Sequence, residues 1–107
     1  MITFPATVKI GGHHFSITFP YTFTERNDRS GDICYESNQI RITNQSYDQP
    51  RSESAIVVTF IHEILHGIDH MNGYGIFGED EGEKKISALS EGIYQVLVDN
   101  GFLKKEL

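Results

Sequence analysis

The chain has 107 residues, of which 38% are hydrophobic and 22% charged, and its 9 Lys and Arg against 15 Asp and Glu give a formal net charge of −6. This length supports one domain over residues 1–107, because a second domain would have too little apolar surface to close a core of its own. The composition is typical of a globular protein and argues against a disordered or fibrous chain. The acidic balance argues against nucleic acid as a partner, since phosphate contacts need a basic surface.

The hydropathy of the chain and its first residues indicate the cellular location of the protein. No stretch approaches the roughly 18 to 20 consecutive apolar residues that span a bilayer. Residues 1–10 lack both the basic start and the continuous apolar run of a secretory signal. We therefore expect a cytoplasmic protein with no membrane partner. The sequence leaves the oligomeric state open.

The first half of the chain predicts β-structure in two hairpins. Gly11-Gly12 separates the β-prone runs 7–10 and 15–19, and Ser37-Asn38 separates the runs 33–36 and 39–43. Both dipeptides are turn signals. Isoleucines alternate with polar residues in the last run, so one of its faces should be buried. With a polar surface loop over residues 24–31 between the hairpins, these elements predict a small, mostly antiparallel sheet.

The second half predicts two helices, so the expected fold class is α+β. Apolar residues recur at helical spacing after the Pro50 to Ser54 segment, until Asn72-Gly73 ends the first helix. A glycine-rich acidic connection over residues 73–82 should be a loop. The second helix carries its apolar residues on one face and ends at Asn100-Gly101.

The first of these helices contains the HExxH pattern, as His62-Glu63-Ile64-Leu65-His66. Two histidines four residues apart lie on one face of a helix, about one turn apart, so both imidazoles can reach one tetrahedral Zn²⁺. Glu63 points about 100° round the helix, near the metal without entering its ligand shell. That is the place of a general base that takes a proton from water, so Glu63 is the predicted catalytic residue.

A catalytic zinc site needs a third protein ligand. The candidates are His70, Glu79, Asp80, Glu81, Glu83 and Glu91. His70 would lie about 12 Å along the axis from His62 on an unbroken helix, and could reach the metal only if the helix broke at Gly67. The acidic run before the second helix is expected to be a solvated loop.

The second helix favours Glu83 among the carboxylates. With about 100° per residue, the apolar stripe of that helix lies near 90° from Glu83 but near 170° from Glu91. Glu91 should therefore face away from the core, whereas Glu83 can lean toward the first helix. Asp69 lies on the same face as the histidines, where its carboxylate could accept a ring N–H and fix a tautomer; a merely solvated carboxylate is the alternative.

Residues 59–100, with HEILHGID followed by ExxIxxLSxGxYQVLxDN, resemble the small zinc metallopeptidases encoded by phages and prophages. The resemblance implies a minimal zincin-like fold in which the edge of the sheet lines a peptide cleft beside the metal. It also implies a gluzincin-like ligand set in which the third ligand is the glutamate at the start of the helix after HExxH. Carried over by position, that residue is Glu83.

Two functions follow as hypotheses. The first is a zinc-dependent peptidase that hydrolyses a peptide or protein substrate, with Zn²⁺ held by His62, His66 and Glu83 and with Glu63 as base. The second is a zinc-containing domain without catalysis that binds a phage or host protein. A metal-free structural or adaptor protein would require the motif to be a coincidence. Candidates for an oxyanion donor are His13, His14, Tyr74 and Tyr94, and their spacing selects none of them.

Overall fold

The sheet of this protein is built from two hairpins that meet in a parallel pairing. The structure is a computed structural model and describes residues 3–24, 29–78 and 80–103. Its four main strands are β1 (Thr7–Ile10), β2 (His13–Thr18), β3 (Gly31–Cys34) and β4 (Gln39–Ile42). Their order in the sheet is β1-β2-β4-β3, in which β1 pairs with β2 and β3 with β4 antiparallel, whereas β2 and β4 are parallel. The expected mostly antiparallel sheet is confirmed, and β3 lies at its edge.

The strand boundaries differ from the expected ones where turns take up residues. Gly11 and Gly12 have φ of +57° and +87°, which lets a tight turn form and lets β2 begin at His13 rather than at residue 15. β3 begins at Gly31, inside the expected loop, and ends at Cys34 because the chain already turns over residues 35–38. A third hairpin, in which β5 (Gln45–Ser46) and β6 (Gln49–Pro50) form a separate two-stranded sheet, was not expected. Residues 25–28 of the predicted loop lie outside the described residues.

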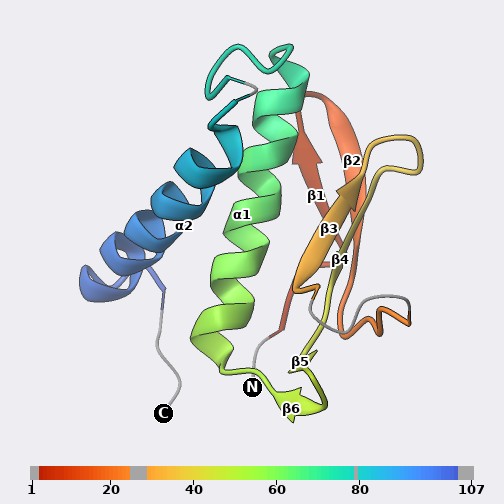
Figure 1. The fold of residues 1–107 in the computed structure, drawn as a ribbon, viewed down its shortest axis with the longest axis vertical. Coiled ribbons are helices and arrows are strands. Elements are labelled where there is room, and N and C mark those ends of the chain that lie inside the picture. Colours follow the sequence, from red (N-terminus) through yellow and green to blue (C-terminus); the bar gives the residue numbers. More distant parts are fainter. Residues whose placement is uncertain (1–2, 25–28, 79, 104–107) are drawn as a thin grey trace.

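The core lies between one face of the sheet and the first helix, α1 (Glu53–Met71). In β4, Ile40 and Ile42 are fully buried against α1, so the expected alternation is confirmed. The buried core is completed by apolar side chains from β1, β2 and α1: Ile10, Phe15 and Ile56. Figure 1 shows α1 between the sheet and the second helix, α2 (Gly82–Asp99). The α+β class with a sheet and two helices is therefore confirmed.

Both helices end where the sequence places their stop signals. The side chain of Ser52 caps α1 by accepting a hydrogen bond from the Ala55 N–H at 3.2 Å. Asn72 and Gly73, at φ +62°, follow the end of α1, and Gly101, at φ +79°, follows the Asn100 cap of α2. In Figure 1, α2 runs back from the C-terminal end of α1 and diverges from it. No helix of the described ranges has the length and apolar character to cross a membrane.

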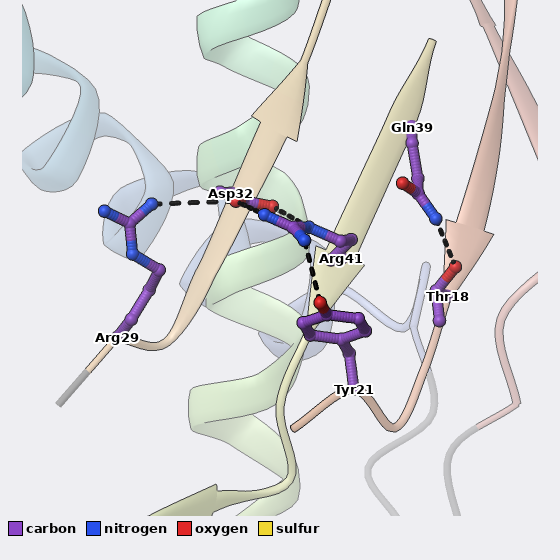
Figure 2. A network of polar contacts seen from close by, with 6 residues as sticks. All are labelled: Thr18, Tyr21, Arg29, Asp32, Gln39 and Arg41. Atoms are coloured by element: carbon purple, nitrogen blue, oxygen red, sulfur yellow. Dashed lines mark hydrogen bonds and ion pairs between the residues drawn. The ribbon is translucent and has the colours of Figure 1, made fainter. Parts of the chain in front are cut away.

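A polar network on the outer face of the sheet holds the edge strand in place. Arg41 lies between the two buried isoleucines of β4 and therefore projects to the opposite face. Its guanidinium binds both carboxylate oxygens of Asp32 on β3, and its Nη1 donates to the Tyr21 hydroxyl at 2.9 Å (Figure 2). Arg29 adds an ion pair to Asp32 at 3.6 Å. Because Asp32 is directly opposite Arg41 in the ladder, the network fixes the position of β3 beside α1.

Candidate metal centre

His62 and His66 lie on successive turns of α1 and point to the same place. Their Nε2 atoms are 3.1 Å apart, and the two side chains are 18% and 27% exposed. The helix continues without a break through Gly67, so the spacing of the motif is translated directly into this geometry. Burial lowers the pKa of His62, against a rise caused by Glu83. The neutral imidazole that results is the form that binds a metal.

Glu83, in the first turn of α2, brings its carboxylate to both histidines. Its Oε1 lies 2.9 Å from the Nε2 of His62 and its Oε2 lies 2.7 Å from the Nε2 of His66. Two ligands on a tetrahedral Zn²⁺ at the usual bond lengths would be about 3.3 Å apart. The observed separations, of 3.1 Å between the two Nε2 atoms and of 2.9 and 2.7 Å to two different oxygens of Glu83, are shorter than this by about 0.2 to 0.6 Å. His62, His66 and Glu83, called the His-His-Glu group below, can therefore hold a metal ion.

The structure places the other ligand candidates that it describes elsewhere. The ring of His70 stacks on Tyr35 with centroids 3.6 Å apart, and its Nδ1 forms a hydrogen bond with the Tyr74 hydroxyl at 2.7 Å. Glu91 is exposed, two turns further along α2 than Glu83. Asp80 and Glu81 are exposed before the helix, and Glu79 lies outside the described residues. Within the part of the chain that the structure describes, the His-His-Glu group is the only cluster of three or more His, Cys, Asp or Glu side chains that could hold a metal ion.

Glu63 lies beside this group but is buried between α1 and the edge strand. Its side chain is 6% exposed. Burial raises its pKa to about 8, and the negative charges of Glu83 and Asp32 act in the same direction. The helical pattern of the sequence predicted the side of α1 on which Glu63 lies. It did not predict that Glu63 is buried, because the burial depends on the close approach of β3.

Gly31 is what allows this approach. A Cβ at this position would lie 2.7 Å from Cγ2 of Thr59 and 3.0 Å from the carbonyl oxygen of Arg41, and 3.6 Å from Oε2 of Glu63. Only glycine fits where the start of β3 touches α1. No signal in the sequence marks Gly31 as part of the site, because its role depends on a contact between residues far apart in the chain.

Asp69 is buried, and among the described residues its side chain forms hydrogen bonds to the connecting loop rather than to a histidine ring. Its Oδ1 accepts from the backbone N–H groups of Ile76 and Phe77 at 3.1 and 3.2 Å. The Phe77 carbonyl in turn accepts from Nζ of Lys85 at 3.1 Å, which ties the loop to α2. Asp69 thus holds the loop that brings Glu83 to the histidines, and its role in fixing a histidine tautomer stays a prediction.

Two cavities flank the His-His-Glu group, and Glu83 lines both. One has a volume of about 290 Å³ and is bounded by His62, Glu63, Ser30 just before β3 and Gly31 at the start of β3. The other, also of about 290 Å³, is bounded by His66, Asp69, Tyr74 and Ile86. Of the four oxyanion candidates, Tyr74 is thus the one beside the group. A substrate that lies across Glu83 could occupy both cavities.

Comparison of the chain with protein-family models, with curated proteins and with solved structures found no match. The geometry of the site therefore carries the functional conclusion by itself.

Proposed function

We propose that this protein is a zinc-dependent peptidase. The observation that carries the proposal is the convergence of the His62, His66 and Glu83 donor atoms within hydrogen-bonding distance of one another, with a buried carboxyl group, Glu63, next to them. Two imidazole nitrogens and one carboxylate are a donor set that zinc accepts in catalytic sites, where a fourth position stays open. Such a zinc ion would polarise a carbonyl group and acidify water.

Glu63 is the proton carrier in this proposal. It borders the same cavity as His62 and Glu83, so it faces the space where a scissile peptide bond would lie. Its carboxylate would take a proton from the attacking water, and would return it to the amine nitrogen as the C–N bond breaks. A bound cation would lower the raised pKa of Glu63, so that the carboxylate form is available at neutral pH.

The substrate in this proposal is an extended peptide or a protein segment that lies along β3. This strand pairs with β4 on one side, and its start borders the cavity that contains Glu63. A peptide that adds to a sheet edge gains backbone hydrogen bonds without a requirement for a particular sequence. The carbonyl of such a peptide would pass beside the His-His-Glu group.

A second candidate function is a zinc-containing domain that binds a protein partner without cleaving it. The size of the cavities favours it, because about 290 Å³ on each side of Glu83 is at the lower end of the volumes of ligand pockets. In that case the metal would hold α2 against α1 and the sheet edge would be the binding surface.

One variant separates the two functions. Glu63→Gln removes a base but no metal ligand, so it should retain zinc and fold while any cleavage of a mixed peptide library is lost. Glu91→Gln is the matched control on an exposed position and should cleave as the wild type does. Zinc-loaded wild type that cleaves nothing would favour the binding domain, and Glu63→Gln that is fully active would exclude Glu63 as the base.

A further inference from the structure

The second helix presents an exposed stripe on the side that does not touch α1. Lys85, Leu89, Gly92, Val96 and Asp99 follow one another at alternating steps of four and three residues, the spacing of a helix-pairing seam. All five are exposed, and Leu89 and Val96 are 41% and 49% exposed. These five residues are called the α2 stripe below.

The α2 stripe faces away from the metal centre, although Lys85 also holds the Phe77 carbonyl of the loop before α2. The side of α2 that packs inward is marked by its buried residues, Gly82, Ile86 and Ser90. With about 100° per residue, the centre of the stripe lies about 100° from Ile86 in one direction and Glu83 about 60° in the other. Occupation of the stripe would therefore leave the His-His-Glu group accessible.

Gly92 stands at the middle of the stripe, and no contact among the described residues accounts for a glycine there. A Cβ at this position would meet no atom within 4 Å. Glycine is a poor helix former, so a glycine in the middle of a helix needs another reason. The close approach of a second helix is one, because two backbones can come together where side chains are absent.

The charges at the ends of the stripe select the partner. Lys85 lies seven residues before Gly92 and Asp99 lies seven residues after it. In a two-fold antiparallel pairing centred on Gly92, the Lys85 ammonium of one copy would face the Asp99 carboxylate of the other, twice. Leu89 would then lie beside Val96 of the second copy. A parallel pairing would instead bring like charges together.

From this self-complementarity we infer that the α2 stripe is a homodimer interface, and that its occupant is a second copy of this chain in antiparallel orientation. The existing contacts of the two charged groups leave room for the pairing. Lys85 donates one N–H to Phe77, and its ammonium has two further donors. Asp99 accepts from Gln95 through Oδ2 at 2.9 Å, and the described part of the chain shows no donor to its Oδ1.

Exchange of the two charges tests the interface. We would measure the dimer dissociation constant of the full chain by sedimentation, from about 1 μM to about 1 mM. The wild type should dimerise in this range, and Lys85→Asp and Asp99→Lys should each weaken the dimer about tenfold, because each replaces two attractive pairs with two repulsive ones. The double variant Lys85→Asp/Asp99→Lys should dimerise as the wild type does. Lys84→Asp, the same charge change on an exposed neighbour outside the stripe, is the control.

Gly92→Gln provides an independent variant, since the open space around Gly92 leaves the fold of the monomer unaffected. It should abolish dimerisation while the circular dichroism spectrum stays unchanged. A wild type that remains monomeric at about 1 mM would overturn the inference and leave the stripe to another partner. A dimer that Gly92→Gln does not weaken, or that the charge exchange fails to restore, would overturn it as well.

Discussion

The buried carboxyl group of Glu63 makes the stability of the metal-free protein depend on pH in a direction that can be worked out. Its pKa is about 8 in the folded protein against a usual value of 4.5, because burial disfavours the charged form. The folded state therefore holds this proton more tightly than the unfolded chain does. The resulting stabilisation is fully present below pH 4.5. It decreases as the pH rises from 4.5 and is lost once the pH has passed through about 8.

The size of the effect follows from one proton. Between the two pKa values, the free energy of unfolding changes by about 1.4 kcal/mol for each pH unit. From pH 6 to pH 7.5, Glu63 should therefore destabilise the wild type by about 2 kcal/mol. Glu63→Gln keeps a neutral side chain of similar shape at all pH values. The difference in unfolding free energy between Glu63→Gln and wild type should shift by this amount in favour of the variant.

Urea denaturation of chelator-treated protein at several pH values measures this difference. All other titrating groups are shared by the two proteins. Their contribution to the pH dependence of the unfolding free energy therefore cancels in the difference. Glu91→Gln is the control, because its exposed position should give a difference that does not change with pH. A difference between Glu63→Gln and wild type that stays constant from pH 6 to pH 7.5 would refute the burial of an uncharged carboxyl group at this position.

Three further predictions concern the site and its supports. Glu83→Ala should weaken zinc binding by at least about 100-fold in a competition titration, since it removes a proposed ligand, and Glu91→Ala should leave it unchanged; equal effects would contradict the ligand assignment. Gly31→Ala should lower the free energy of unfolding by about 1–3 kcal/mol in urea, because its Cβ would overlap Thr59, and a stability equal to wild type would exclude this contact. Asp69→Asn should cost about 1–3 kcal/mol, measured in the same way, because an amide oxygen accepts the loop N–H groups more weakly than a buried carboxylate does; an unchanged stability would show that Asp69 does not hold the loop.

The elements of this fold could be predicted because their signals are local. The glycines of Gly11-Gly12 and Asn72-Gly73 adopt positive φ, as the predicted turn and helix stop require. These signals act through neighbouring residues and do not depend on contacts with distant parts of the chain. The strand order could not be predicted in this way. The two hairpins are joined by the parallel pairing of β2 with β4, in which Ile17 lies opposite Ile40. No local pattern in either hairpin predicts which of its two strands becomes a central strand of the sheet.

The site shows the same division between local and distant contacts. The convergence of His62 and His66 follows from helical spacing alone. The apolar stripe of α2 predicts the face on which Glu83 lies, but the approach of Glu83 to the histidines also requires the connecting loop to return α2 to α1. The burial of Glu63 depends on Gly31, and the loop contacts of Asp69 depend on how residues 73–78 fold back, so neither could be derived from one helix. Ligation of a metal by the His-His-Glu group remains a prediction.

Metal analysis of the purified protein tests the central claim most directly. After reconstitution with zinc and removal of excess metal, the wild type should retain one Zn²⁺ per chain, measured by inductively coupled plasma mass spectrometry. His62→Ala should retain none, because it removes one of two imidazole ligands, whereas His70→Ala should retain one. Wild-type protein that stays free of metal, or His62→Ala that binds zinc as tightly as wild type, would contradict the assignment of the His-His-Glu group as a zinc centre.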